Sequence, residues 1–483
     1  MAALVAKEPD TTTTTVSSPS PTTQDAPRRS FRSFIWDTDT HLKSLEEKHL
    51  LLKLDIAILT TGCLGFFMKY GKPLQRLRLR HARSPFYIPS TLIIQRVRPS
   101  IWLAAMEIGW GIFTFAQAGL HNVNELYAFR FLVGFFESSF FPSLLYLLGS
   151  WYTRTELAKR VALFHMTAPL GTAFGGYLQA AVYKNLNGQR GLEGWRWLYI
   201  VCGCMTIPVG IATLFVLPDT PYTTRAWFIS EKEREIAIER VQRAGKAPPV
   251  KITLNTFKRI LSSWKWYAFV AGYVLYGSAC GGNGYFGIWL KSENFSVAQR
   301  NVIPTGTSLI SAACVVLWGF LSDYTGSRFA FVLIPLIYGL LPNGILAFWP
   351  PSLELKQFVF LTIGVQLMTA VFYSWANEIC ADDNEQQAVV ISSMNGVPVR
   401  GCCVVADRYL PQTMAPTFRG IWPPTTFGLV IAAIIGVVVI QLLILRDERR
   451  AKRVDNGGGI ERLQVLYSAL GQIMGYNAKF LRI

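Results

Sequence analysis

Long apolar runs recur along the chain and alternate with shorter polar segments. A helix that crosses a bilayer needs about 17–25 consecutive, mostly apolar residues. A weaker run covers residues 388–410, and ten clear runs cover residues 50–68, 101–119, 127–149, 161–183, 197–217, 267–290, 302–322, 329–349, 357–377 and 425–445. This pattern predicts an all-α polytopic membrane protein.

A polar segment at residues 218–264 divides these runs into two sets. It holds nine Lys or Arg residues against five acids, and Ser230 followed by Glu233 is typical of the start of a short helix. Two helical bundles joined by a basic loop are the layout of a two-halved secondary transporter. We therefore expect five parts: a disordered cytosolic tail at 1–49, a bundle at 50–217, a basic cytosolic loop at 218–264, a bundle at 265–445 and a cytosolic tail at 446–483.

The charge pattern favours a lipid bilayer over nucleic acid as the partner. The net charge is +17, but only 16% of the residues are charged and 51% are hydrophobic. Ordinary globular chains have about 25% charged residues. The basic residues lie between the apolar runs, as expected for loops on the cytosolic side of a membrane. The polar tail at 1–49 has no apolar stretch of the kind found in signal peptides, so we expect no cleaved leader.

Neither the cysteines nor the acids are arranged as a metal site. The eight cysteines lie mostly in apolar runs, and no CxxC pair is accompanied by a second pair of ligands. We interpret the acids that follow the run at 357–377 as a solvated loop, because no histidine accompanies them: Glu378, Asp382, Asp383 and Glu385. We expect no metal, no organic cofactor and no enzyme activity, since the chain shows no clustered His, Cys or Ser centre.

One helix is missing from the predicted topology. If the basic segments face the cytosol, one more span is needed between residues 68 and 100. The stretch from Lys69 to Arg83 instead holds six Lys or Arg residues and no acid. We therefore predict a nominal twelve-helix protein whose second helix is disrupted at 69–85. We hypothesise that this segment does not come from the ancestral reading frame or splice pattern, and that the chain as written transports poorly.

Two ionisable residues lie inside one apolar run. Arg130 and Glu137 are seven residues apart, nearly two helical turns, so both project from one face. Charges at membrane depth are costly and normally face the protein interior or a water-filled pathway. One interpretation is a transport site in which Arg130 holds a carboxylate and Glu137 exchanges a proton. The alternative is a structural ion pair between helices. His165, in another run, is either a packed residue or a proton relay.

Three further features concern loops and helix packing. Gly171 and Gly175 form a small-xxx-small face that permits close helix packing. Asn283 stands among four glycines, and such a broken helix either lines a transport cavity or is a flexible packing helix. Asn294 begins an Asn-Phe-Ser glycosylation sequon in a predicted external loop.

A ten-residue loop pattern, from Gly319 to Arg328, stands between two apolar runs. Gly319 and Gly326 allow a tight turn, Asp323 can face the start of the next helix, and Arg328 can pair across the two bundles. The pattern resembles the loop signature of the major facilitator superfamily. We predict that these four residues form a conformational-switch loop.

Several stretches together resemble fungal members of this superfamily, in the anion:cation symporter group that includes allantoate and pantothenate permeases. The resemblance covers roughly 45–68 and 86–396, and more faintly 408–445. It rests on these stretches: 96–100, 130–142, 194–197, 217–226, 375–378 and 392–395. It implies a monomeric plasma-membrane carrier that takes up a small organic anion, a carboxylate or vitamin, with protons by alternating access.

The resemblance implies substrate and proton roles for Arg130 and Glu137, and a switch role for Asp323 and Arg328. The chain departs from the group at the end of the first helix and at 397–407, where Pro398 and Arg400 interrupt an apolar helix. Two alternatives therefore stay open. The same fold could export a secondary metabolite, or the chain could be a membrane sensor that does not transport.

Overall fold

The computed structural model describes residues 43–71, 90, 93–94, 97–243, 254–280, 286–380, 383, 385–387, 389–397 and 427–473. Side chains are described in these ranges except at 154–155, 158, 254–257 and 451–473. The described chain is built of helices and short connections and contains no strand. The predicted all-α fold is confirmed.

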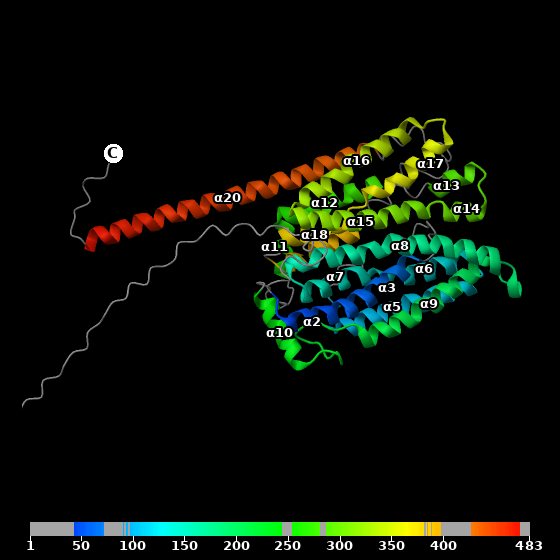
Figure 1. The fold of residues 1–483 in the computed structure, drawn as a ribbon, viewed down its shortest axis with the longest axis horizontal. Helices are drawn as coiled ribbons and strands as arrows, with labels where there is room; N and C mark the ends of the chain where they lie inside the picture. The colour runs from blue at the N-terminus through cyan, green and yellow to red at the C-terminus, as the bar shows by residue number, and fades with distance from the viewer. Residues whose placement is uncertain are drawn as a thin grey trace, which may run out of the picture.

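The first half of the chain forms a layer of long helices (Figure 1). In chain order these are α2 (Leu45–Leu54), η1 (Asp55–Leu59), α3 (Thr60–Tyr70), α5 (Pro99–Ala116), η4 (Gln117–Gly119), α6 (Val123–Ser138), α7 (Phe140–Trp151), α8 (Arg154–Leu186), η5 (Gln189–Gly191) and α9 (Gly194–Val216). Capping boxes begin α6, with Asn122 and Glu125, and α8, with Thr153 and Glu156. These caps satisfy backbone N–H groups that the first turn of a helix leaves without partners.

The segment between the two halves contributes two short helices, α10 (Glu231–Arg243) and α11 (Leu254–Ser262). The second half then follows with α12 (Trp264–Ala279), α13 (Phe286–Ser292), α14 (Val297–Val302), α15 (Thr305–Thr325), α16 (Arg328–Phe348), α17 (Leu353–Thr362), η7 (Ile363–Gln366), α18 (Thr369–Ile379) and α20 (Gly428–Ile473). Residues 389–397 are also helical. The weak run predicted at 388–410 lies mostly outside the described residues.

Eight helical stretches of the described chain are long and apolar enough to cross a membrane. They overlap eight of the ten predicted runs. The run at 161–183 lies inside α8, a 33-residue helix that contains glycines, a proline and His165. The run at 267–290 is divided between α12 and α13, and residues 281–285, with Asn283, lie outside the described residues.

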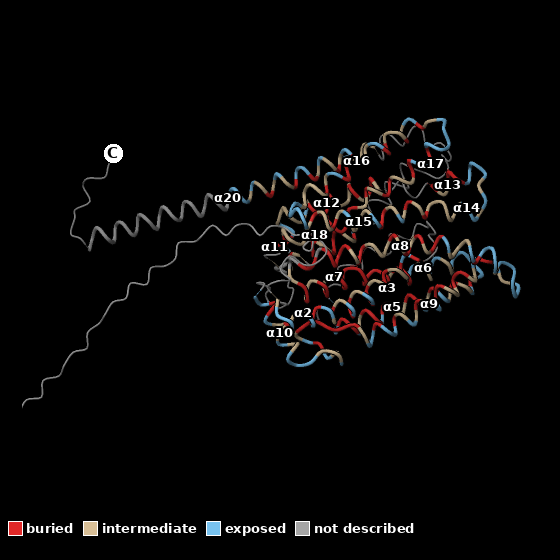
Figure 2. Tube along the Cα trace, in the orientation of Figure 1, coloured by how far each residue is buried: buried red, intermediate tan, exposed pale blue. Residues whose placement is uncertain are grey.

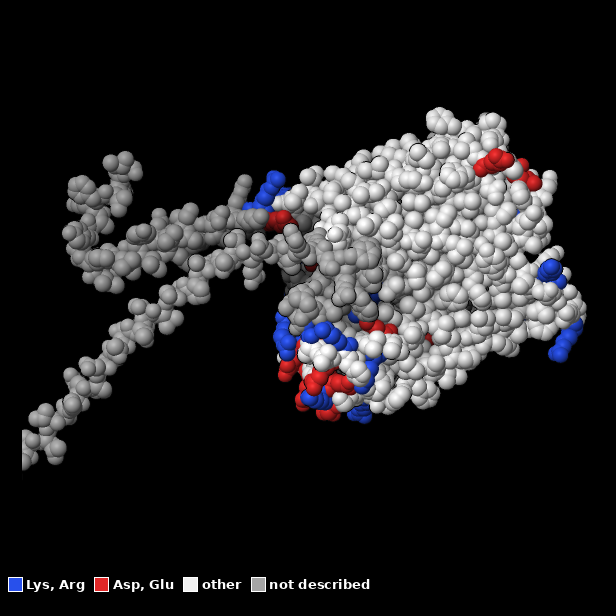
Figure 3. Space-filling view, viewed as in Figure 1, with Lys and Arg blue, Asp and Glu red and all other residues white. Residues whose placement is uncertain are grey.

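On the face of the molecule that Figure 3 shows, the charged side chains of the described residues gather at the two ends, and the belt between them is almost free of charge. Buried residues line the inner sides of the helices, and the connections at the two ends are largely exposed (Figure 2). Large apolar side chains are exposed along the belt, for example Phe215 of α9 and Leu341 of α16. Exposed apolar surface of this extent indicates contact with lipid.

Helix α8 joins the two halves. A Cβ on Gly319 of α15 would lie 2.6 Å from the Cβ of Ala162 in α8. A Cβ on Gly176 of α8 would lie 2.6 Å from the carbonyl oxygen of Asn301 in α14. The contacts are 14 residues apart along α8, so the two halves touch both near its start and farther along its length.

The predicted small-xxx-small face of α8 is confirmed, and it packs against the end of α3. A Cβ on Gly171 would lie 2.5 Å from the carbonyl oxygen of Phe67, and one on Gly175 would lie 2.8 Å from that of Gly71. Lys69 and Tyr70 are part of helix α3. The first helix therefore ends at Tyr70, two residues beyond the predicted end at 68. The predicted disruption of a second helix at 69–85 stays a prediction, because residues 72–85 lie outside the described residues.

Helices α2 and α10 lie at one end of the bundle with residue 447 of α20, and we call this end the loop end (Figure 1). Lys53 donates to Glu233 of α10 at 2.8 Å, and Trp264 donates to Asp447 at 2.7 Å. Arg98, just before α5, pairs with Asp219, which follows α9. The continuous helix formed by α2, η1 and α3 begins at the loop end, so Gly71, which follows it, lies away from the loop end.

Candidate substrate and proton site

A buried ion pair lies midway along the first-half helices. The ammonium of Lys69 in α3 lies 4.0 Å from the carboxylate of Glu137 in α6, and it also donates to the Glu137 carbonyl at 3.4 Å. Lys69 is 8% exposed and Glu137 is 4% exposed. The Lys69 ammonium lies 5.7 Å from the ring centre of Phe66, one turn back along α3. Glu137 therefore has a basic partner from another helix.

Arg130 is not that partner. It lies seven residues before Glu137 on α6, which corresponds to a rise of about 10 Å along the helix. Its guanidinium donates to the hydroxyl of Tyr199 in α9 and stacks over that ring at 5.4 Å. The structure thus places Arg130 toward α9 and brings Lys69 to Glu137.

A further carboxylate, which the sequence interpretation missed, lies inside the first half. Glu107 of α5 is fully buried and accepts a hydrogen bond from the Thr213 hydroxyl of α9 at 2.9 Å. A Cβ on Gly65 of α3 would lie 2.7 Å from its other carboxylate oxygen. The signal was present, since Glu107 is a single acid in the apolar run at 101–119.

Aromatic rings meet at the boundary between the two halves. The ring of Tyr373 in α18 lies 5.8 Å from the His165 ring of α8 at an angle of 20°, and 5.2 Å from the Phe141 ring of α7. Phe66 of α3 contacts His165 at 5.9 Å. Since Phe141 follows Glu137 by one turn toward the loop end, this aromatic cluster (Phe66, Phe141, His165 and Tyr373) lies on the loop-end side of the ion pair.

The second half faces this cluster with a break in its helices. Between η7 and α18 the chain leaves helical geometry at Leu367 and Met368. The Tyr276 hydroxyl lies 3.2 Å from the Thr369 hydroxyl and accepts from the Met368 N–H at 3.3 Å. The break therefore places backbone polar groups and hydroxyls beside Tyr373.

The predicted switch loop is a tight helix-to-helix turn. Gly326 ends α15 with φ 73°, a left-handed conformation that favours glycine. Arg328 pairs with Asp323 and donates to Glu378 of α18 at 2.7 Å. Two expectations are therefore wrong. Asp323 and Glu378 both belong to the second half, so Arg328 does not pair across the bundles, and Glu378 lies in α18 instead of a solvated loop.

Asn294 occupies an exposed turn between α13 and α14 with φ 63°. Its glycosylation stays a prediction. Among the residues that the structure describes, no group of three or more His, Cys, Asp or Glu side chains is placed to hold a metal ion.

Comparison with known proteins decides the family. The sequence model described as Major Facilitator Superfamily matches residues 82–406, about two thirds of the chain. The chain belongs to the Major Facilitator Superfamily. It is a multi-pass membrane protein of a transporter family and not an enzyme. The match begins at residue 82, near the end of the segment at 69–85 for which a disruption was predicted.

Curated relatives of this superfamily member match over most of their length. The MFS transporter PfmaC of Pestalotiopsis fici is 34% identical over 442 residues, which cover 85% of this chain and 83% of the relative. The pantothenate transporter liz1 of Schizosaccharomyces pombe is 31% identical over 445 residues, with 86% of each chain covered. The pantothenate transporter FEN2 of Saccharomyces cerevisiae is 27% identical over 454 residues, which cover 85% of this chain and 87% of the relative.

A solved structure shares the superfamily fold. A bacterial homologue of the human lysosomal transporter Spinster, crystallised in an inward-facing and occupied conformation, has a TM-score of 0.50 and 15% identity. The likeness covers 84% of this chain and 98% of that chain, and it concerns the fold alone.

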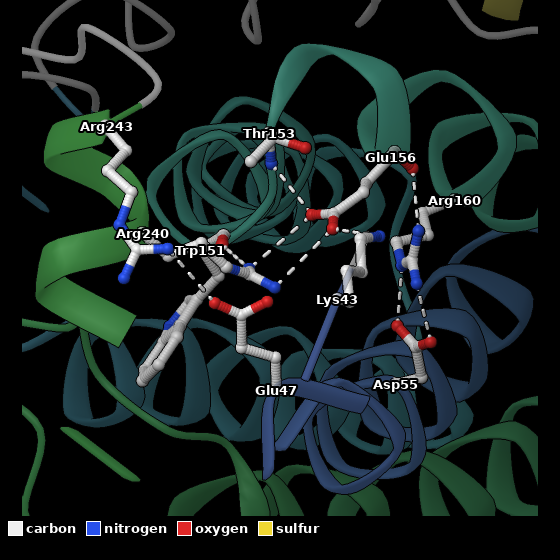
Figure 4. Close-up of polar contacts among 9 residues, drawn as sticks. All are labelled: Lys43, Glu47, Asp55, Trp151, Thr153, Glu156, Arg160, Arg240 and Arg243. Atoms are coloured by element: carbon white, nitrogen blue, oxygen red, sulfur yellow. Dashed lines mark hydrogen bonds and ion pairs between the residues drawn. The ribbon is translucent and has the colours of Figure 1, made fainter. Parts of the chain in front are cut away.

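At the loop end of this superfamily member, a charge network ties α10 to the first half (Figure 4). Glu156 of α8, which is fully buried, pairs with Lys43 and with Arg240 of α10. Arg240 also donates to the Trp151 carbonyl. Beside it, Arg160 binds both carboxylate oxygens of Asp55, at 2.6 and 2.8 Å. The network is therefore part of the folded first half.

Helix α11 is tied to the second half instead. Arg259 of α11 pairs with Asp383 at 2.7 Å and with Glu385 at 2.9 Å, in the segment that follows α18. Each half of the superfamily fold thus carries one helix of the central segment.

Proposed function

We propose that this chain is a proton-coupled uptake carrier for a small organic anion in the plasma membrane. The observation that carries the proposal is the buried Lys69–Glu137 pair. The Lys69 ammonium can hold the carboxylate of a substrate, and the Glu137 carboxylate can take up a proton. Ionisable groups at membrane depth are costly and mark substrate or proton pathways. The loop end is the cytosolic end, because basic segments stay on that side.

The Lys69–Glu137 pair couples proton uptake to substrate binding, because Glu137 and the substrate carboxylate compete for Lys69. While Glu137 is ionised, it holds Lys69. A proton from outside forms an O–H bond on Glu137 and removes its charge, which frees the ammonium of Lys69. The substrate carboxylate then pairs with Lys69, so the site keeps the same total charge. Release on the cytosolic side reverses both steps.

The aromatic cluster closes the cytosolic side of this site. Tyr373 from the second half contacts His165 and Phe141 from the first half. Since these contacts cross between the halves, they must separate when the halves rock apart at the loop end. We infer that the ion pair is sealed from the cytosol in this conformation.

The relatives support a carboxylate substrate. Two of them are named pantothenate transporters, and a third, of Saccharomyces cerevisiae, is named vitamin H transporter. Pantothenate is a monocarboxylate. One buried ammonium can pair with its one carboxylate, whereas a neutral or cationic substrate would leave the ammonium without a counter-charge.

Uptake by purified protein in liposomes tests the proposal. We expect an inwardly directed proton gradient to accelerate uptake of labelled pantothenate or another monocarboxylate, and a protonophore to remove the acceleration. An uptake rate that is the same with and without the proton gradient would refute proton coupling. Binding without transport of any carboxylate in a panel would favour a sensor, and net export against the gradient would favour efflux.

A further inference from the structure

We propose that His165 is the second contact of the substrate: its Nε2 hydrogen bonds to an amide or hydroxyl group of an anion whose carboxylate is held by Lys69. The inference rests on the proposed function and deepens it by defining the substrate class. The expected substrate is a small monocarboxylate with one hydrogen-bonding group a few bonds from the carboxylate and an apolar remainder.

His165 has an unused polar atom in a buried place. The residue is 8% exposed, and no described residue provides a hydrogen bond to its Nε2. Buried polar atoms in native proteins nearly always have a partner, so each exception needs an explanation. A polar group of a bound substrate would supply this hydrogen bond.

The position of His165 suits a ligand of the transport pathway. Its ring lies between Phe66 and Phe141 of the first half and Tyr373 of the second half. A molecule bound here touches both halves, as a transported substrate must if its binding is to bias their arrangement. The surrounding rings offer an apolar wall for the part of the substrate that carries no polar group.

The distance to Lys69 limits the length of the substrate. The Lys69 ammonium lies 5.7 Å from the Phe66 ring centre, and that centre lies 5.9 Å from the His165 ring centre. The Lys69 ammonium and the centre of the His165 ring are therefore at most about 12 Å apart. One hydrogen bond of about 2.8 Å to Lys69 and one to His165 leave at most about 6 Å between the two polar groups of the substrate.

An amide fits this requirement well. A neutral imidazole presents one N–H donor and one acceptor nitrogen, so Nε2 is a donor in one tautomer and an acceptor in the other. An amide offers both a carbonyl acceptor and an N–H donor, so it can bond to either form. A β-amido acid, in which two carbons separate the amide from the carboxylate, lies within the reach set by Lys69.

Competition between matched anions tests the inference. N-acetyl-β-alanine and hexanoate have chains of equal length, but only the first carries an amide. We expect N-acetyl-β-alanine to inhibit carboxylate uptake by the wild-type protein about tenfold better, the effect of one hydrogen bond. In His165→Phe we expect the ratio of the two inhibition constants, hexanoate over N-acetyl-β-alanine, to fall to about one. His165→Gln keeps a polar group, so we expect a ratio between one and the wild-type value. His121→Phe, at an exposed site, should keep the wild-type ratio.

Two results would overturn the inference while leaving the proposed function intact. One is equal inhibition by the two anions in the wild-type protein. The other is an unchanged ratio in His165→Phe and His165→Gln. If neither anion competes and the wild-type protein shows no proton-driven uptake, the proposed function fails, and the inference fails with it.

Discussion

The ammonium of Lys69 lies 4.0 Å from the carboxylate of Glu137, and both side chains are buried at membrane depth. Helix α3 supplies the cation and α6 supplies the anion. Removing either member leaves an uncompensated buried charge, which is far more costly than the loss of a surface pair. Substitutions of the two residues should therefore have large and different effects on transport.

Glu137→Gln should separate binding from proton coupling. The amide keeps the shape of the side chain but cannot ionise, so Lys69 stays available to the substrate at every pH. We expect substrate binding to persist and the rise of uptake at acidic external pH to disappear. Glu239→Gln, at an exposed position of α10, should keep the wild-type pH profile. An unchanged profile in Glu137→Gln would favour the structural ion pair.

Lys69→Met should weaken substrate binding more than Arg130→Ala does. The methionine fills similar space but leaves the carboxylate of the bound substrate without a buried cation, a loss of about 3 kcal/mol or roughly 100-fold in affinity. The sequence interpretation gave this role to Arg130, which the structure turns toward Tyr199. Binding titrations of both variants decide between the two cations, and a greater loss in Arg130→Ala would restore the earlier assignment.

Gly171→Ala should destabilise the contact between α3 and α8. The added Cβ would lie 2.5 Å from the Phe67 carbonyl oxygen, which is backbone and cannot move aside cheaply. We expect a loss of about 1–3 kcal/mol, seen as a lower melting temperature of the purified protein. Gly287→Ala, where a Cβ meets nothing within 4 Å, is the matched control and should leave the melting temperature unchanged.

Glu156→Gln should loosen α10 from the first half. The substitution leaves Arg240, 6% exposed, without its buried carboxylate. Breaking a buried pair costs about 3–5 kcal/mol, so we expect earlier melting and faster proteolysis at α10. Glu239→Gln removes an exposed partner of Arg243 and should change little. Equal stability of the two variants would show that the network does not hold α10.

The helices and the turn at Gly326 could be predicted from the sequence because both depend on neighbouring residues. Runs of apolar side chains identified eight of the spans, and Gly326 marked the end of α15. The packing of Gly171 and Gly175 followed from their spacing alone. Each of these features is local, so the identity of the partner did not have to be known.

The site itself depends on contacts between distant residues, and there the sequence interpretation was incomplete. Lys69 was assigned to a disrupted segment because basic residues follow it, yet α3 carries it to Glu137, 68 positions away. Glu378 was assigned to a loop, but Arg328 binds it from a position 50 residues earlier. Charge spacing along one chain cannot reveal a partner that tertiary packing supplies.

The attachment of α10 to one half and α11 to the other has a consequence for how the protein can be divided. The chain between Arg243 and Leu254 is the covalent link between two units that each keep their own helix of the central segment. Two separately made polypeptides, ending and beginning within 244–253, would each retain their ion pairs with that helix. Co-expression of such fragments should therefore reassemble a working carrier, because the covalent link at 244–253 is not needed to hold either helix to its half.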